Sequence, residues 1–383
     1  MTQSHSDSVD PAHSPEASGP KEPDARDLGR ICERLRDELA DMAGRHVLIT
    51  GGAGFLGYYL VRTLIHHNAK ARDKITATVY DNFSRGVPEW LAELESGHLD
   101  LVRHDVTDPM PADAPPFDFI IHGASIASPI YFRKHPLETM DANVLGLRHL
   151  LDHALAQTRA GHGLRGFLFF SSSEIYGDPE PAHIPTPESY PGRVSCTGPR
   201  ACYDESKRYG ETLCVNFHRQ HGLPVKVARP FNNYGPGLKI SDRRLLADFS
   251  RSILDGRDLV MHSDGSPTRT FCYVADAVVG YYKTLVRGRG GEAYNIGAEA
   301  PEISVRDVAA LTVDAARELF GYEGRVIHKA DDDRDYLTDN PQRRCPAVAK
   351  ARRELDFEAE VSLEEGLRRM LLWYKNHPTA IDA

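Results

Sequence analysis

The sequence predicts an α/β fold in which a doubly wound parallel sheet carries a smaller C-terminal lobe. Two observations carry this prediction. Apolar segments of strand length alternate with helical patterns up to about residue 235, and the glycine-rich turn GGAGFLG joins the first strand to the first of these helices. Continuous apolar strands separated by helices indicate a parallel sheet that is covered on both faces. Beyond residue 235, loops rich in Asp, Gly and Arg mix with short helices, which indicates the smaller lobe.

The N-terminal part contains a tail and then a helix. Residues 1–25 are rich in Ser, Pro, Asp and Glu, a composition typical of a disordered tail. Leu28, Ile31, Leu35 and Leu39 follow at helical spacing. We therefore expect a short helix that packs on the outside of the main domain.

Six segments are predicted as strands of the main sheet. They are RHVLIT (45–50), KITATVYD (74–81), LDLVRHDV (99–106), FDFIIHGAS (117–125), GFLFFSSSE (166–174) and VKVARP (225–230). We assign residues 26–235 to a Rossmann-type dinucleotide-binding domain with its N-terminal helix. Residues 236–383 then form mainly the substrate-binding lobe, with some segments returning to the first domain.

Charge and cysteine content exclude several functional classes. The 383 residues carry a formal net charge of -9, which argues against binding to nucleic acid or to an anionic membrane. The six cysteines are scattered without a CxxC pair, so we expect neither a disulfide framework nor a metal site, and a cytoplasmic location. We also expect no membrane-spanning segment.

The glycine-rich turn is a candidate cradle for the pyrophosphate of a dinucleotide. Gly51, Gly54 and Gly57 lie between a strand and a helix start, where glycines allow close approach and the helix N-terminus offers N–H groups. Asp81 ends the second strand and would bind ribose hydroxyls, which favours NAD over NADP. The alternatives are an ordinary βα turn and a turn-forming Asp. The further candidate cofactor-binding residues are Phe55, Leu56, Asn82, Asp105, Val106 and Ala124.

A catalytic pair is predicted on a later helix. Tyr203 and Lys207 stand four residues apart and would share one helix face, and the lysine cation would favour the phenolate form of Tyr203. Such a tyrosine can remove a proton from a sugar hydroxyl while a hydride leaves for the cofactor. Ser172 and Glu174 end the fifth strand at the sheet edge where ligands bind. A chance YxxxK motif and serines that merely cap a turn are the alternatives.

Together these residues resemble the extended short-chain dehydrogenase/reductase family that acts on nucleotide-sugars, and within it the UDP-glucuronate decarboxylases (UDP-xylose synthases). The resemblance covers residues 45 to about 375 and is carried by SSSEIYGDPE, GPRACYDESKR, ASPIYFRKHP, ARPFNNYGP, SPTRTFCYVAD and NPQRRCP. Related 4,6-dehydratases have an Asp acid where this chain has Ser173. The 4-epimerases usually have small or hydroxyl residues at Glu174. The resemblance therefore favours decarboxylation.

The resemblance also implies roles for individual residues. Tyr203 would take the 4-hydroxyl proton as hydride passes to NAD, the 4-ketone would allow carbon dioxide to leave from carbon 5, and the ketone would then be reduced again. Lys207 would tune Tyr203, Ser172 would support the oxyanion, and Glu174 and Arg269 would lie near carbon 5. The residues implied to anchor the substrate are Ser172, Asn232, Arg244, Arg269, Tyr273 and Arg343.

Three departures from the decarboxylase pattern lie on the substrate side. Phe132 stands where the family usually has a tyrosine, Gly237 replaces an arginine, and the segment DDDRDYLTDNPQRRCP is longer. A nucleotide-sugar 4-epimerase, a 4,6-dehydratase and a non-catalytic protein with a dinucleotide fold stay open as alternatives. The resemblance also implies a homodimer, in which the helix after Asn143 and the helix near Tyr203 pair with those of a second copy.

Overall fold

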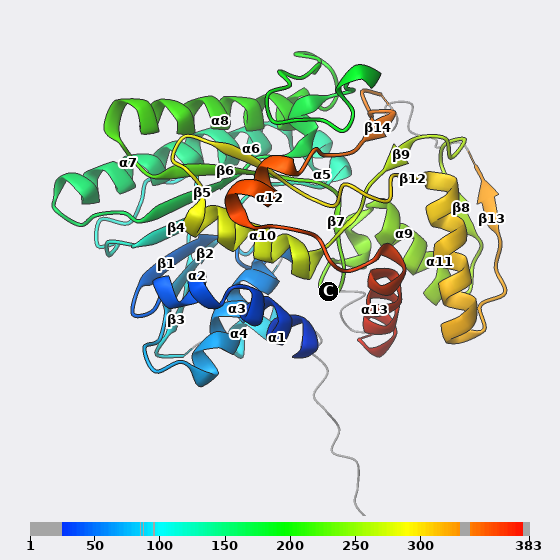
Figure 1. The fold of residues 1–383 in the computed structure, drawn as a ribbon, viewed down its shortest axis with the longest axis horizontal. Coiled ribbons are helices and arrows are strands. Elements are labelled where there is room, and N and C mark those ends of the chain that lie inside the picture. Colours follow the sequence, from blue (N-terminus) through cyan, green and yellow to red (C-terminus); the bar gives the residue numbers. More distant parts are fainter. Residues whose placement is uncertain (1–24, 85, 87, 95, 330–337, 378–383) are drawn as a thin grey trace, which may run out of the picture.

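A seven-stranded parallel sheet forms the centre of the protein in a computed structural model that describes residues 25–84, 86, 88–94, 96–329 and 338–377 (Figure 1). The predicted tail, apart from Ala25, lies outside these residues. In spatial order the strands are β11 (Ala293–Ile296), β6 (Val225–Pro230), β5 (Gly166–Phe170), β4 (Phe119–His122), β1 (His46–Thr50), β2 (Thr76–Asp81) and β3 (Leu99–Arg103). The chain order reverses beside β1, which makes the sheet doubly wound as the sequence predicts.

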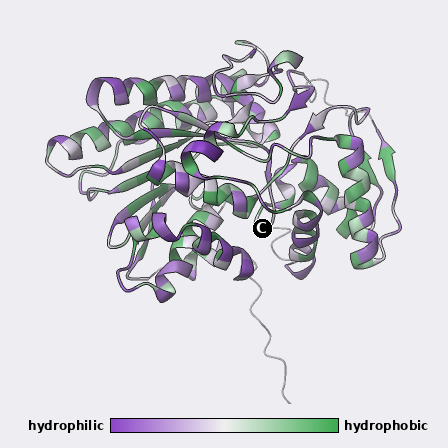
Figure 2. Ribbon diagram, viewed as in Figure 1, coloured by the Kyte–Doolittle hydropathy of each residue, from purple (hydrophilic) through white to green (hydrophobic). Residues whose placement is uncertain are grey.

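Side chains of the central strands alternate between two separate cores. Val47 and Ile49 point into one core together with Phe170, whereas Leu48 and Phe169 point into the other. Successive residues of a strand face opposite sides, so a sheet covered on both faces needs apolar residues at every position. Figure 2 shows this pattern: the inner strands are largely hydrophobic, and the outer helices alternate hydrophobic and hydrophilic turns.

Helices cover both faces of the sheet. The face with Leu48 packs against α7 (Leu147–Arg159) and α8 (Ala201–His221), and the other packs against α3 (Phe55–Lys70) and α10 (Val274–Arg287). Shorter helices complete this part of the molecule: α4 (Glu89–Ala92), α5 (Pro129–Lys134), α6 (Pro136–Asp141) and α12 (Ala349–Leu355). Between α6 and α7 the chain continues through a π-helical turn, Ala142–Gly146.

The expected N-terminal helix is two short helices, α1 (Ala25–Arg34) and α2 (Arg36–Asp41). Leu28, Ile31, Leu35 and Leu39 are all buried, and they join the core beneath α3 and α10. The predicted apolar stripe is therefore the face with which α1 and α2 attach to the main domain.

The smaller lobe holds α9 (Leu245–Leu254), α11 (Val305–Phe320) and α13 (Leu363–Asn376). Its short strands pair as β8 (Leu259–Met261) with β13 (Val326–His328), β7 (Asn233–Tyr234) with β10 (Cys272–Tyr273), and β9 (Thr268–Arg269) with β12 (Ile303–Ser304) and β14 (Arg343–Arg344). α10, β11 and α12 also come from the chain beyond residue 235, but they belong to the large sheet and its covering helices. β11 is the strand of the large sheet that the sequence reading missed, because AYNI is short and far in sequence from its partner β6.

Candidate active site

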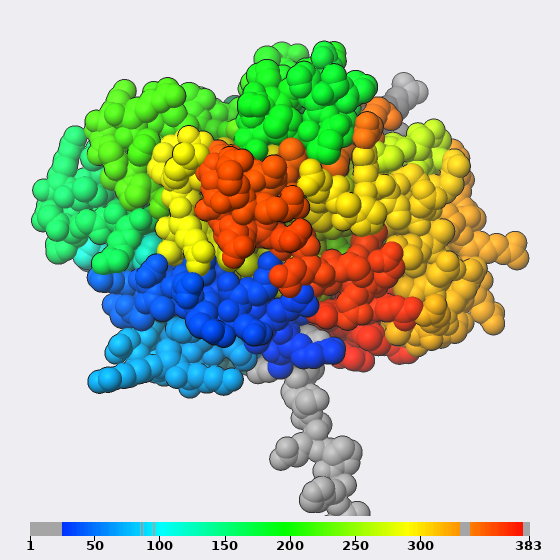
Figure 3. All heavy atoms as spheres, viewed as in Figure 1, coloured from blue at the N-terminus to red at the C-terminus, as the bar shows by residue number. Residues whose placement is uncertain are grey.

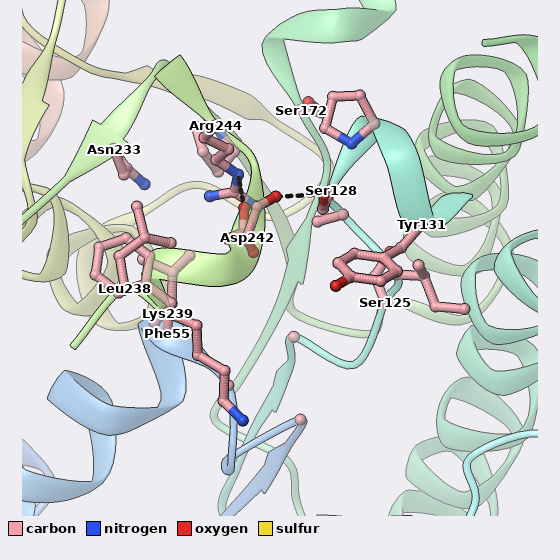
Figure 4. A pocket seen from close by; sticks show the side chains of 18 of the residues that line it. Phe55, Ser125, Ser128, Tyr131, Ser172, Asn233, Leu238, Lys239, Asp242 and Arg244 are labelled. Atoms are coloured by element: carbon pink, nitrogen blue, oxygen red, sulfur yellow. Dashed lines mark hydrogen bonds and ion pairs between the residues drawn. The ribbon is translucent and has the colours of Figure 1, made fainter. Parts of the chain in front are cut away.

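A cavity of about 1420 Å³ runs along the carboxyl ends of the central strands and continues against the smaller lobe. Its walls come from the turn after β1, the ends of β2, β4 and β5, helix α8, and the lobe segments around residues 238–249. Figure 4 looks into this cavity, with Phe55, Leu238 and Lys239 close together on one side and Ser125, Ser128 and Tyr131 on the other. Ligands of open α/β sheets bind in this place.

The turn after β1 has room only for glycines at two of the three predicted positions. Gly51 has φ +72°, and a Cβ there would come within 2.7 Å of the Ala124 backbone. A Cβ on Gly57 would lie 2.4 Å from the carbonyl oxygen of Gly52, at the start of α3. The bare backbone and the α3 N-terminus therefore form a concave surface of N–H groups, which fits a pyrophosphate.

Asp81 closes this cradle at the end of β2. Its carboxylate accepts hydrogen bonds from the backbone N–H groups of Ala53 (3.0 Å) and Phe83 (2.9 Å), and Asn82 donates to Asp105 at 2.9 Å. These contacts fix the loop after β2 beside the glycine turn. All ten predicted cofactor-binding residues outside α8 line the cavity: Gly51, Gly54, Phe55, Leu56, Gly57, Asp81, Asn82, Asp105, Val106 and Ala124.

Tyr203 and Ser172 meet in the middle of the cavity. Tyr203 projects from the first turn of α8, and Ser172 follows β5. Burial raises the pKa of Tyr203 to about 12, while a hydrogen bond with Ser172 acts in the opposite direction. The sequence reading expected Lys207 and the cationic nicotinamide of an oxidised cofactor together to favour the phenolate, and burial acts against that effect.

Lys207 lies one helical turn beyond Tyr203. Its ammonium donates to the carbonyl oxygen of Phe170 at 2.8 Å and lies 5.6 Å from the centre of the Tyr203 ring. Burial lowers the pKa of Lys207 to about 7. The predicted shared helix face thus exists, with the amine held at the end of β5.

Glu174 sits in a cluster of arginines. Its Oε2 atom accepts from Arg200 (2.6 Å) and Arg344 (2.5 Å). Burial alone would raise the pKa of Glu174, but the two guanidiniums outweigh it and lower the pKa to about 2. The neighbouring Asp204 lies 3.8 Å from Arg200, and burial together with the charge of Glu174 raises its pKa to about 8. Glu174 is therefore an ionised carboxylate fixed between cations.

Three predicted substrate residues also line the cavity. Arg244 donates to Asp242 at 2.9 Å, as drawn in Figure 4. Asn232 donates to the carbonyl oxygen of Thr270 at 2.8 Å. Arg269 donates to the carbonyl oxygens of Thr268 and Pro341, and burial lowers its pKa to about 9. Its hydrogen bonds hold the segment before β14 against the cavity.

Two predicted substrate residues are not among the residues that line the cavity. The Tyr273 side chain is fully buried behind β10, and its hydroxyl donates to Asp27 at 2.6 Å. Arg343 faces outward and pairs with Glu302 at 2.6 Å. Neighbouring residues of a strand point to opposite sides, so it is Arg344 that reaches the cavity and Glu174. The structure thus places both side chains outside the cavity for the same reason, because motif matching does not give side-chain direction.

The sequence reading missed several residues that line the cavity. Arg200 stands three residues before Tyr203 in GPRACY, and Arg344 follows Arg343, so both lay inside motifs already singled out. Ser128 precedes α5 and Tyr131 lies in its first turn, and Figure 4 shows Ser128 bonded to the Asp242 backbone, at 2.7 Å. Both belong to ASPIYFRKHP, one of the stretches that carry the resemblance, so the signal was present although these two residues were not singled out.

Phe132, which replaces the family tyrosine, stacks on Tyr203. The two ring centres are 5.0 Å apart and the rings are inclined by 10°. The Phe132 side chain is buried, and the guanidinium of Arg200 lies 5.5 Å from its ring centre. Phe132 therefore fixes the plane of the Tyr203 ring.

These features define an α/β enzyme fold with a dinucleotide cradle beside a Tyr–Lys pair. The chain belongs to the NAD dependent epimerase/dehydratase family, which it matches over residues 47–297.

Named relatives and solved structures agree with this assignment. The chain is 37% identical over 340 residues to UDP-glucuronic acid decarboxylase 3 of Arabidopsis thaliana, covering 88% of this chain and 91% of the relative. It is similar to UDP-glucose 4-epimerase of Thermotoga maritima (TM-score 0.72, 26% identity, 86% of this chain and 98% of the other). It is also similar to the dTDP-glucose 4,6-dehydratase DesIV of Streptomyces venezuelae with NAD bound (TM-score 0.75, 26% identity, 88% and 99%).

Proposed function

We propose that this protein is an NAD-dependent nucleotide-sugar decarboxylase that acts on UDP-glucuronate or a related nucleotide uronate. The observation that carries the proposal is the placement of Tyr203, Ser172 and Glu174 in one cavity with the dinucleotide cradle. The similarity to UDP-glucuronic acid decarboxylases over most of both chains supports this reading. The glycine turn and Asp81 fit NAD, and the DesIV structure is one with NAD bound.

In this mechanism Tyr203 removes the proton from the 4-hydroxyl of the sugar. NAD, held by the glycine turn and Asp81, would supply the acceptor for the hydride from carbon 4 and its source for the later reduction. The hydrogen bond with Ser172 lowers the pKa of Tyr203 against the larger effect of burial, and the cations of Lys207 and of a bound nicotinamide ring would favour the phenolate further. The Ser172 hydroxyl then donates to the oxygen on carbon 4. Phe132 keeps the phenol ring in one plane during the proton transfer.

Loss of carbon dioxide follows from the 4-ketone, which is β to the carboxylate on carbon 5. The bond between carbon 5 and the carboxylate breaks, and its electron pair moves into the ketone as an enolate, which then takes a proton at carbon 5. Arg200, Arg269 and Arg344 place positive charge at this end of the cavity, where Glu174 is the carboxylate paired with two of them. Such a surplus of cations suits a sugar with its own carboxylate.

Asn232 and Arg244 anchor the rest of the substrate in this proposal. Arg244 lies on the lobe side of the cavity, and its guanidinium suits a phosphate of the nucleotide (Figure 4). The lobe thus holds the nucleotide and the Rossmann edge holds the cofactor, with the reacting carbons between them.

Mass spectrometry of the products tests this function. Incubation with UDP-glucuronate and NAD is expected to release carbon dioxide and a UDP-pentose. A uronate of unchanged mass would replace the proposal by a 4-epimerase, the activity named for the Thermotoga maritima relative. In a parallel incubation with UDP-glucose, a product lighter by one water would indicate a 4,6-dehydratase. No turnover on any nucleotide-sugar, with NAD tightly retained, would indicate a non-catalytic protein.

We also infer a homodimer that pairs through α6, the turn before α7, and α8. Leu137, Met140 and Leu145 are exposed large hydrophobic side chains on the first two elements, and Tyr209 is another on α8. Such a patch favours a self-complementary contact with a second copy. Light scattering is expected to give twice the chain mass for the wild type and a monomer for Leu145→Asp; a monomeric wild type would contradict the inference.

The cytoplasm is the location we propose. All six cysteines lie in the described part of the chain and are free thiols, which fits a reducing compartment. Separately, among the residues described, no helix combines the length and the apolar character needed to cross a bilayer. Fluorescence microscopy of a tagged chain in its native cell would test the location.

A further inference from the structure

The first turn of α1 carries a carboxylate that is completely buried. Asp27 has no exposed surface. One carboxylate oxygen accepts from the hydroxyl of Tyr273 at 2.6 Å, and the other accepts from the guanidinium of Arg369 at 2.6 Å. A buried carboxylate is stable only when it is paired and hydrogen-bonded, so these contacts require a fixed position of all three residues.

The two partners of Asp27 belong to elements that build the cavity wall. Tyr273 lies on β10, which pairs with β7 through Asn233, a residue that lines the cavity. Arg369 lies on α13, one helical turn before Trp373. The side chains of Trp373 and His377 both line the cavity, stacked with ring centres 4.8 Å apart.

α13 is coupled to another part of the cavity through Tyr374. Its hydroxyl donates to the carbonyl oxygen of Leu238 at 2.6 Å, and Leu238 lines the cavity beside Lys239 and Arg244 (Figure 4). A shift of α13 would therefore move both the Trp373–His377 pair and the segment on which Leu238 lies.

A second set of contacts ties α1 to the chain just before α13. Arg34 pairs with Asp276 at 2.5 Å and donates to the carbonyl oxygen of Glu358. The other oxygen of Asp276 accepts from the N–H groups of Glu360 (2.9 Å) and Val361 (2.8 Å). Figure 3 shows the N-terminal atoms directly against those of the C-terminal helix. α1 thus contacts α13 itself through the Asp27–Arg369 pair and the chain before α13 through Arg34.

We propose that Asp27 is a positioning residue for substrate binding: through Arg369 and Tyr273 it holds α13, and with it the lobe wall of the cavity, in the geometry that accepts the nucleotide. None of the hydrogen bonds of Asp27 named above reaches the glycine turn that would hold the cofactor. This inference rests on the proposed nucleotide-sugar substrate. It assigns a role in substrate binding to a helix that precedes the Rossmann fold and does not line the cavity.

The test compares Asp27→Asn and Arg369→Gln with the matched control Arg368→Gln. Arg368 is the neighbouring residue on α13, and its partner is Glu318 on the surface. Titration calorimetry measures the affinity of the full chain for UDP, for dTDP and for NAD. The nucleoside diphosphate that the wild type binds more tightly serves as the probe. Both test variants are expected to weaken binding of the nucleoside diphosphate about fivefold or more and to keep the affinity for NAD within about twofold of the wild type. The control is expected to change neither.

Kinetics with UDP-glucuronate give a second readout. The two test variants are expected to raise KM about fivefold or more with kcat within about twofold of the wild type. The double variant is expected to raise KM no further than the single variant with the larger effect, because the two residues act as one contact. Unchanged nucleoside diphosphate affinity in folded Asp27→Asn and Arg369→Gln would overturn the proposal and leave α1 with a purely structural role.

A milder substitution keeps the test possible if the two variants above do not fold. Tyr273→Phe removes one donor but keeps the Asp27–Arg369 pair, and a folded Tyr273→Phe is expected to weaken the nucleoside diphosphate about twofold without affecting NAD. If Asp27→Asn and Arg369→Gln do not fold, unchanged binding in Tyr273→Phe overturns the proposal. These binding measurements need no turnover, so a wild type that binds the diphosphate without releasing carbon dioxide refutes the proposed function alone.

Discussion

The two sides of the cavity are built in different ways. The pyrophosphate cradle on the cofactor side consists of backbone: glycines and a helix N-terminus that lie within one strand–turn–helix unit. The substrate side consists of side chains from segments far apart in sequence, such as Glu174 with Arg344, joined by ion pairs. A surface of backbone tolerates no added atoms, whereas a surface of charged side chains depends on the geometry of each pair. The following substitutions sharpen this comparison.

The largest effect is expected where the two sides meet, at Tyr203. Replacement by phenylalanine removes the base and leaves the ring stacked on Phe132, so kcat should fall about 1000-fold or more. The affinities for NAD and UDP should stay within about twofold, as calorimetry can check. A Tyr203→Phe enzyme with wild-type kcat would refute the assigned chemistry.

A single methyl group tests the cofactor side. In Gly57→Ala the new Cβ would lie 2.4 Å from the Gly52 carbonyl oxygen, so the turn must open and NAD affinity should fall about 10- to 100-fold. The affinity for UDP should change little. Gly163→Ala is the control, because a Cβ there has nothing within 4 Å. An unchanged NAD affinity in Gly57→Ala would show that the turn is not the cradle.

The pH dependence of stability tests the charges on the substrate side. The folded pKa of Asp204 is raised to about 8, so between about pH 4 and 8 the folded chain holds a proton that the unfolded chain has lost. This contribution favours folding below that window and is lost as the pH rises through it.

Asp204→Asn keeps a neutral side chain at every pH. From pH 5 to 7.5 its free energy of unfolding should therefore fall by about 2 to 3 kcal/mol less than that of the wild type, as measured by urea denaturation. Asp152→Asn, at an exposed pair with Arg148, should follow the wild type. Parallel curves for Asp204→Asn and the wild type would mean that Asp204 is ionised in the fold.

The smallest effects separate two adjacent arginines. Arg344→Met leaves Glu174 with one cation and should lower kcat/KM about tenfold. Arg343→Met removes only a partly exposed pair with Glu302 and should change kcat/KM less than about twofold. Equal effects of the two substitutions would contradict the side-chain directions on β14.

The two sides of the cavity also differ in how much of them could be predicted from the sequence. The glycine turn, Asp81 and the Tyr203–Lys207 spacing are local patterns, and strand and helix geometry place such patterns reliably at the carboxyl edge of the sheet. Tyr273 and Arg343 were assigned by their motifs alone. The motif did not reveal that Tyr273 points to Asp27 on a helix 246 residues away in sequence.

The sequence by itself determined the fold class, the cradle and the pair on α8, because each depends on residues within one or two turns of each other. Only the tertiary structure decided which arginine meets Glu174, how strongly burial raises the pKa of Tyr203, and that α1 holds α13. Burial and long-range pairing arise when distant segments exclude water together, and no local spacing encodes which segments those are.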